Sequence, residues 1–415
     1  MAFVRLLLAL VVLLGALPGL AATTSAPRTG PLTVYFFDVG QGDAALVVSP
    51  TGKTVLIDGG TPESDDRLVA RVRELVQGPL DLVILTHPHL DHLGGMAKVI
   101  QAVGAKRYMD PDFVHPSEAY VKLLKVVEEE VGKREKREKR EKEGKVMKPE
   151  PNPNAPETLL TIGLGEGATL TILSPRAPQE PFLTHTRSDV NANSIVAKLT
   201  YGKTAFLFVG DAEPETEEDL LRKPIDFTST VLKVAHHGGR YSSTAPFLAA
   251  VKPQAAVISC GAGNDYGHPA NETLQRLGAT GAHIFRTDLQ GEVVAVSNGT
   301  TVTLTPSKGK VSPTVVPGRV EGPVATGPMP TKASRAPGAL QPQVVPARGT
   351  LPERSTTVAA SARSSGPGYV SLKGSKVFHR EDCSTLKRAK TKERKEYSTR
   401  EEAMRERRAA EDCDP

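Results

Sequence analysis

The strongest constraint on the fold is a run of metal-ligand side chains directly after a short apolar segment. Residues 86–95 read THPHLDHLGG and follow Leu80 to Leu85. A strand ending in such a turn can direct several side chains at one point, and imidazole and carboxylate groups suit Zn²⁺, Mn²⁺ and Fe²⁺. Only ten histidines occur in 415 residues, so this cluster is improbable by chance. The sequence therefore predicts metal ligands here, namely His87, His89, Asp91 and His92.

The motif His-x-His-x-Asp-His resembles the signature of the metallo-β-lactamase superfamily, whose members are two-metal hydrolases with an αββα sandwich fold. Further motifs are similar to those of the hydrolase domain of ComEC-like competence proteins, in the order of that family, over roughly residues 32–305. They are FDVGQGDA from Phe37, Asp58-Gly59-Gly60, Asn191-Ala192-Asn193-Ser194, Gly210-Asp211, His236-His237-Gly238 and Tyr266-Gly267-His268-Pro269. The resemblance implies an α/β protein with the αββα metallo-β-lactamase sandwich.

The hydrophobic pattern agrees with a sandwich of two sheets covered by helices. Short apolar or alternating runs predict strands, and one-sided apolar stripes predict helices. The predicted strands are 32–37, 44–48, 54–57, 80–85, 168–173, 194–200, 204–209, 229–235, 254–259 and two near 291–305. The predicted helices are 65–76, 94–103, 213–222 and 244–251.

The resemblance assigns the ligands to two divalent cations, zinc or manganese. His87 and His89 would bind one cation, Asp91 and His92 the other, and Asp211 would bridge both. One of His236 and His237 would complete the set, and the sequence leaves this choice open. Many superfamily members have another histidine where this chain has Asn191 to Ser194, so the first site is expected to be poorer in ligands.

Other residues are predicted to act beside the cations. Asp91 could also orient the attacking water, and His268 could protonate a leaving oxygen or bind phosphate. Asp38 and Asp58 would accept hydrogen bonds from ligand imidazoles, although Asp38 could equally cap a turn. Residues expected to line the cleft or contact substrate are Gln41, Asp43, Asn193, Ser194 and Ser243. Ser243 and its neighbours could instead cap the helix at 244–251.

The composition divides the chain into four segments. Residues 1–22 are predicted to be a cleaved signal peptide, since the apolar run Leu6 to Leu14 is followed by small residues. No cysteine lies there for a lipid anchor, so a secreted, periplasmic or cell-envelope location without stable membrane insertion is expected. Residues 31–306 would form the hydrolase domain with a charged insert at 133–157, where Lys-Arg-Glu repeats extend a helix or project as a solvated segment. Residues 307–366 are rich in Pro, Gly, Ser and Thr and are predicted to be a disordered linker.

Residues 367–415 resemble the small Ada-type metal-binding module. His379, Cys383 and Cys413 are its possible metal ligands, but Ala410 stands where that pattern has a further cysteine. Structural zinc sites prefer four firm ligands, and a Cys383–Cys413 disulfide is the alternative in an oxidising compartment. Cys260 lies in an apolar strand and is expected to be a buried, small hydrophobic residue.

The combined pattern predicts an exported metal-dependent phosphodiesterase, a DNase with DNA as its substrate and a place in competence or DNA uptake. The charged insert and the tail after residue 306 carry more lysine and arginine than acid, which would favour a polyanion. One alternative is a phosphorylcholine or cell-wall phosphodiesterase, although the absence of Trp counts against an aromatic cage for choline. Another is a non-catalytic DNA-binding competence accessory protein that works through its tail.

Overall fold

The computed structural model of the chain describes residues 30–137, 146–149, 158–175, 181–309, 312–320, 369–372, 377–380, 394–397 and 408–409. The predicted signal peptide lies outside these residues, as do Cys383, Cys413 and most of the predicted linker.

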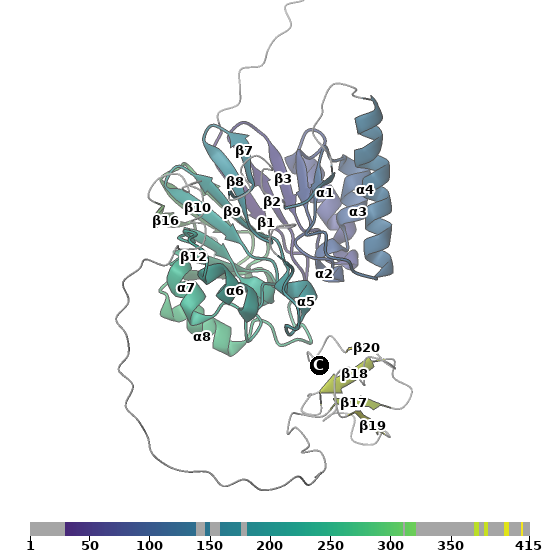
Figure 1. Ribbon diagram of the computed structural model, residues 1–415. Helices are drawn as coiled ribbons and strands as arrows, with labels where there is room; N and C mark the ends of the chain where they lie inside the picture. Colours follow the sequence, from purple (N-terminus) through teal and green to yellow (C-terminus); the bar gives the residue numbers. More distant parts are fainter. Residues whose placement is uncertain are drawn as a thin grey trace, which may run out of the picture.

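Two sheets lie face to face in the described part of the chain (Figure 1). The first has the strand order β16-β15-β14-β1-β2-β3-β4-β5-β6 and the second has the order β13-β12-β11-β10-β9-β8-β7. The strands of the first are β1 (Leu32–Phe36), β2 (Ala45–Val48), β3 (Thr54–Ile57), β4 (Leu82–Ile84), β5 (Tyr108–Met109), β6 (Val146–Met147), β14 (Val293–Ser297), β15 (Thr301–Pro306) and β16 (Thr314–Pro317). Those of the second are β7 (Thr161–Gly165), β8 (Ala168–Ser174), β9 (Val196–Tyr201), β10 (Thr204–Phe208), β11 (Val231–Lys233), β12 (Ala255–Ile258) and β13 (His283–Arg286).

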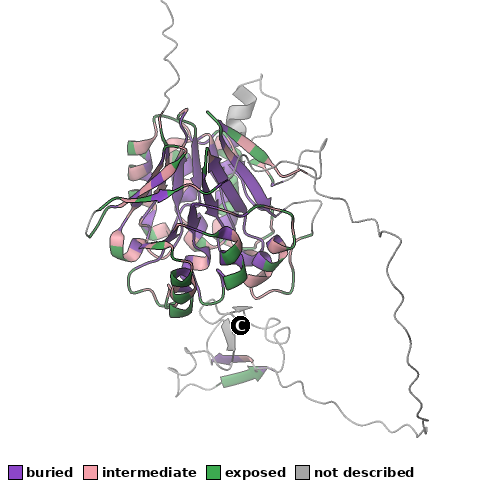
Figure 2. Ribbon diagram, turned by 90° about the vertical axis from the view of Figure 1, so that its left-hand side faces the viewer, coloured by how far each residue is buried: buried purple, intermediate pink, exposed green. Residues whose placement is uncertain are grey.

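Helices cover the outer face of each sheet. Those next to the first sheet are α1 (Asp65–Leu75), α2 (Leu90–Leu93), α3 (Met96–Val103) and α4 (Glu118–Arg137). Those in the second half are α5 (Asp189–Ala192), α6 (Pro214–Leu221), α7 (Ala245–Val251), α8 (Asn271–Ala279) and α9 (Thr287–Gln290). Figure 2 shows the strands of the sandwich as mostly buried, while exposed residues gather on the helices and loops around them. The predicted αββα sandwich is confirmed.

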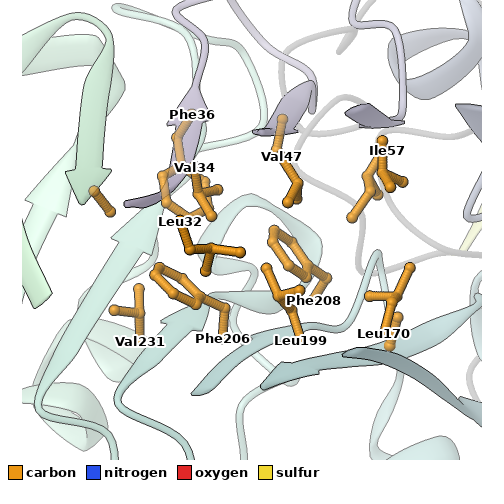
Figure 3. Packing of buried hydrophobic residues seen from close by; sticks show 14 of the residues in the cluster. Leu32, Val34, Phe36, Val47, Ile57, Leu170, Leu199, Phe206, Phe208 and Val231 are labelled. Carbon is orange, nitrogen blue, oxygen red and sulfur yellow. The ribbon is translucent and has the colours of Figure 1, made fainter. Parts of the chain in front are cut away.

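The core between the sheets follows from the alternation of side chains along each strand. In β1, Leu32, Val34 and Phe36 are buried in the inter-sheet layer, whereas Thr33 and Tyr35 between them are not fully buried. Figure 3 shows these side chains facing those of β10, where the rings of Phe36 and Phe208 lie 6.1 Å apart. The apolar layer holds the two sheets in a fixed relation.

This arrangement places the polar loops of both halves at one edge. β3 and β4 are parallel, as are β10, β11 and β12, so each parallel group directs its carboxyl ends the same way. Gly210 lies two residues after the end of β10 and has φ +50°. A Cβ at this position would lie 2.9 Å from Cβ of Thr86, which follows β4. Only glycine allows the strand ends of the two sheets to approach so closely.

Two boundaries differ from the sequence prediction. β16 pairs with β15 and buries Val316, so residues 312–320 belong to the folded domain and the linker prediction is wrong for them. Their run of β-branched residues completes a sheet edge. Within the predicted charged insert, α4 extends to Arg137, as expected, but Val146–Met147 forms β6 against β5.

The C-terminal residues form a separate small sheet, in the order β19-β17-β18-β20. Its strands are β17 (Tyr369–Leu372), β18 (Val377–Arg380), β19 (Arg394–Tyr397) and β20 (Arg408–Ala409). His379 lies in β18 opposite Val370. Among the residues that the structure describes, no helix has the length and hydropathy to cross a membrane.

Candidate metal centre

The predicted ligands meet around Asp211, which is 2% exposed. Asp211 follows β10, the histidines of residues 87–92 follow β4, and His236 and His237 follow β11 in a 3₁₀ turn, Ala235–Gly238. Strand ends of both sheets therefore contribute to one cluster.

The first pair of predicted ligands has the spacing of two atoms on one cation. His87 Nε2 lies 3.1 Å from His89 Nδ1 and 3.8 Å from Asp211 Oδ2. Nitrogen ligands at 2.0–2.1 Å from a tetrahedral ion are separated by about 3.3 Å. The geometry thus suits a site formed by these two imidazoles and one oxygen of Asp211.

The second group surrounds the same carboxylate. His92 Nε2 lies 3.3 Å from Asp211 Oδ1, and His237 Nε2 lies 3.1 Å from Asp91 Oδ2 and 3.6 Å from Asp211 Oδ2. His92, His237 and Asp211, with Asp43, bring one possible ligand atom each to within 4.8 Å of one another. A second cation would fit between these groups.

His236 faces Asp211 as well, with its Nε2 3.7 Å from Oδ2. The sequence left open which of His236 and His237 is a ligand, and the structure directs the Nε2 of both at Asp211. The turn that achieves this is strained, because His236 has φ 50° and His237 has φ 52°. Such left-handed conformations cost about 1–2 kcal/mol per residue, so the surrounding structure must enforce them.

In three of these histidines, the ring nitrogen that points away from Asp211 lies next to a buried carboxylate. Nδ1 of His92 lies 2.9 Å from Asp58 Oδ2, Nδ1 of His237 lies 3.3 Å from Asp43 Oδ1, and Nδ1 of His236 lies 3.2 Å from Glu213 Oε1. The hydrogen bond of His237 Nδ1 goes to Ser259 O at 3.0 Å, and Asp43 acts on this ring through its charge.

A carboxylate at Nδ1 places the proton there and leaves the Nε2 lone pair for a cation. Each of the three imidazoles is thus prepared to ligate through the atom that faces Asp211.

Buried atoms without hydrogen bonds test whether the site fits metal ions. His92 Nε2 and Asp211 Oδ1 are both buried and lack a hydrogen-bond partner, although they lie 3.3 Å apart. Unsatisfied buried polar atoms are costly unless a further group binds them. The donor set of imidazole and carboxylate is the one that divalent transition metals prefer, so the residues fit such a cation.

The charges of the cluster alter its protonation. Burial alone would raise the pKa of Asp91, but the charge of His92 and the hydrogen bond from His237 outweigh it and lower the pKa. Burial alone would lower the pKa of His237, but the charges of Asp211 and Asp43 raise it to about 10. Burial lowers the pKa of His89 to about 4. A cation that binds here must displace protons from the imidazoles that the carboxylates stabilise.

The residues predicted to surround the cations divide into those near the cluster and those away from it. Asp58 accepts hydrogen bonds from Thr86 and contacts His92, as predicted. For Asp38 the sequence left open the same role or the capping of a turn; its carboxylate does not contact a ligand imidazole but pairs with Lys308 Nζ at 2.8 Å. The neighbouring residues Phe37 and Val39 are buried against the helices, and alternation turns Asp38 the other way.

Of the predicted cleft residues, Gln41 joins the loop after β1 to the loop after β12. Its Oε1 accepts from Gly261 N at 3.0 Å, and its Nε2 lies 3.4 Å from His268 Nδ1. The amide N–H at Nδ1 favours the His268 tautomer with the proton on Nε2. His268 lies beside the cluster, with its ring 5.5 Å from that of His236.

Asn193, Ser194 and Ser243 have structural contacts rather than exposed positions. Asn193 binds the backbone of Leu183 and Asp189, and Ser194 Oγ accepts from Asp211 N at 3.2 Å. Ser243 is fully buried, and its backbone N–H donates to Glu217 at 2.6 Å. The capping interpretation is not met either, since the side chain at the start of α7 makes no cap hydrogen bond.

The sequence interpretation missed three residues at the centre. Glu213 caps α6 while it holds His236, and an acid before Pro214 just after Gly210-Asp211 was the available signal. Lys233 is buried on β11 with its Nζ 2.6 Å from Asp43 Oδ2. The ring of His115 lies 5.9 Å from that of His89. Because the two residues are far apart in the sequence, no local pattern predicted this contact.

Comparisons with known proteins give the family to which the chain is similar. Residues 37–262 match the protein family described as the metallo-beta-lactamase superfamily. The chain is 27% identical over 277 residues to ComE operon protein 3 of Bacillus subtilis (63% of this chain, 32% of that protein), and 40% identical over 104 residues to competence protein ComA of Neisseria gonorrhoeae (25% of this chain, 15% of that protein). The chain thus spans about a third or less of the curated relatives it matches.

Among solved structures, the metallo hydrolase Igni18 of Ignicoccus hospitalis has a TM-score of 0.35 and 17% identity, covering 63% of this chain and 98% of that one.

Proposed function

We propose that this chain, which belongs to the metallo-β-lactamase superfamily and resembles ComEC-like competence proteins, is a metal-dependent phosphodiesterase that cleaves DNA. The family supports a hydrolase with a competence role, and the nature of the bond it cleaves is our proposal.

The observation that carries the proposal is the set of ligand atoms on both sides of Asp211. Its two oxygens face His87 and His92 respectively, and the imidazoles of His236 and His237 lie beside it. Two divalent cations held there would lower the pKa of a water molecule and neutralise charge on a phosphoryl group. We assign His87, His89 and His236 to one cation, Asp91, His92 and His237 to the other, and Asp211 to both.

The remaining residues orient the ligand imidazoles or act on the water and the substrate. Asp58, Asp43 and Glu213 fix the tautomers of three ligands, and Asp91 is placed to accept a proton from an attacking water. His268, with its proton on Nε2, would donate a hydrogen bond to a phosphate oxygen. Because burial and the neighbouring His236 and His237 lower the pKa of His268 to about 4, it acts as a neutral donor rather than as a cationic acid.

DNA is proposed as the substrate because the relatives are named as competence proteins. We also propose that residues 1–22 direct export, that residues 321–366 connect the domains, and that His379, Cys383 and Cys413 belong to an accessory module. Sequencing the N-terminus of the mature protein tests the first of these. Deleting residues 321–415 tests the last, since the hydrolase domain should keep its turnover.

The decisive experiment is cleavage of linear and circular DNA by purified residues 27–415 with Mn²⁺, beside His89→Ala. Degradation that disappears in the variant supports a metal-dependent nuclease. Intact DNA from a folded, metal-loaded sample would contradict DNA as the substrate, and phosphorylcholine and cell-wall phosphodiesters would then be assayed.

A further inference from the structure

Two tyrosines stand exposed at the rim of the metal centre. Tyr241 and Tyr266 are each 51% exposed, in loops that follow β11 and β12. Tyr241 comes shortly after His236 and His237, and Tyr266 comes two residues before His268. Exposed tyrosine rings next to a polar cluster offer flat faces on which another ring can stack and hydroxyl groups that can form hydrogen bonds.

The ring of Tyr266 continues a stack that starts at the metal centre. It lies 5.8 Å from the ring of His268 at an interplanar angle of 26°, and His268 lies 6.2 Å from His237 at 25°. Asn264 binds the backbone N–H and C=O of His268 at 3.0 Å and 2.6 Å. The stack is therefore held in place before any ligand arrives, and its outer member is an aromatic face.

The ring of Tyr241 is in contact with the positively charged side chain of Arg187. The guanidinium carbon of Arg187 lies 3.7 Å from its ring centroid. The loop that bears Arg187 is tied down by Asn193, which binds Leu183 and Asp189. Among the residues that the structure describes, no carboxylate forms an ion pair with Arg187, and its guanidinium contacts the ring of Tyr241.

These features match an unpaired nucleotide. A base can stack on an aromatic ring only when it is not stacked in a duplex, and a guanidinium binds phosphate oxygens through paired N–H groups. We infer that Tyr266 stacks on a nucleobase beside the scissile phosphate and that Arg187, on Tyr241, binds a neighbouring phosphate, so the enzyme acts on single-stranded DNA or frayed ends. This inference rests on the proposed phosphodiesterase function.

The test compares two single-stranded substrates of equal length, oligothymidylate and an abasic oligonucleotide, which share the backbone and differ in the bases. The wild-type enzyme should prefer oligothymidylate. Tyr266→Ala should lower kcat/KM on oligothymidylate roughly 5- to 150-fold, the loss of one stacked base, and leave the abasic substrate unchanged. Tyr266→Phe, the matched control, keeps the ring and should keep the preference.

Arg187 gives an independent readout. Arg187→Ala should weaken the binding of both oligonucleotides alike. It should also reduce the slope of log KM against log salt concentration by about 1, as expected for the loss of one phosphate contact. Equal hydrolysis of both substrates by the wild type, or an equal loss on both in Tyr266→Ala, overturns the inference while the phosphodiesterase function stands. Hydrolysis of neither substrate by the metal-loaded wild type overturns the proposed function itself.

Discussion

Replacing Asp58 by asparagine should weaken metal binding without unfolding the protein. Asp58 is 2% exposed, and its carboxylate accepts from Thr86 N at 2.7 Å, from Thr86 Oγ1 at 2.8 Å and from His92 Nδ1 at 2.9 Å. Asparagine has the same shape, but one of its two terminal atoms is a donor. When its NH₂ group faces Nδ1 of His92, the ring proton moves to Nε2, the nitrogen that faces Asp211, and the lone pair for the cation is lost.

The expected magnitude follows from the role of such partners. Removing a group that orients a metal-binding histidine costs about 10- to 100-fold in metal affinity. That range corresponds to about 1.4–2.7 kcal/mol of binding free energy. The loss of a buried negative charge next to the cations acts in the same direction, so we expect the upper half of the range.

Isothermal titration of Mn²⁺ or Zn²⁺ into metal-stripped protein measures the effect. Asp38→Asn is the matched control, because Asp38 pairs with Lys308 and should leave the affinity unchanged. Thermal melting of both variants shows that each is folded. An unchanged affinity in Asp58→Asn, or the same loss in both variants, would refute the assignment of Asp58 as the group that orients His92.

Three further predictions concern other parts of the molecule. Glu213→Gln should lower the affinity for one of two bound cations by roughly 10-fold, because it removes the charged partner of His236. Metal titration of this variant should then resolve two affinities. Burial raises the pKa of Glu217 to about 7, above its ordinary value of 4.5, so its stabilising contribution is complete below pH 4.5 and is lost as pH rises through 7. The difference in unfolding free energy between wild type and Glu217→Gln should therefore change by about 3 kcal/mol between pH 4.5 and 8 in urea titrations, and a flat difference would contradict the burial argument. Phe206→Ala should cost about 3–5 kcal/mol of unfolding free energy, since Phe206 is 1% exposed between the sheets, and a loss below 1 kcal/mol would mean that the layer collapses around the cavity.

The layers of the sandwich and its main ligands could be predicted because their signals are local. A strand followed by alternating histidines, and apolar runs of strand length, are visible within ten or so residues. β5, β6, β7 and β13 were missed because they are short or flanked by charged or glycine-rich sequence, and β16 was missed because its Pro-rich surroundings are typical of a linker.

The partners of the ligands were harder to predict, because their contacts join distant segments. Glu213 reaches His236 only through the left-handed turn at residues 236 and 237, and positive φ is uncommon even for histidine, so the sequence does not predict the turn. Asp38 and Asp58 have equivalent positions after strands in the sequence, yet only Asp58 lies where β3 and β4 end side by side. Pairing of strands, rather than residue type, decides which carboxylate reaches an imidazole.

The ligand atoms around Asp211 come from both sheets, and this has a consequence for stability as well as chemistry. His87, His89 and His92 belong to the first half of the chain, whereas Asp211, His236 and His237 belong to the second. A cation bound between them would be a reversible cross-link between the halves, present only when the two sheets are docked. Binding at a thousandfold excess over Kd would add about 4 kcal/mol to the free energy of unfolding. The stability of the folded protein would thus depend on the concentration of divalent ions around it. A chelator would make the protein easier for proteases to cleave and would also abolish its activity.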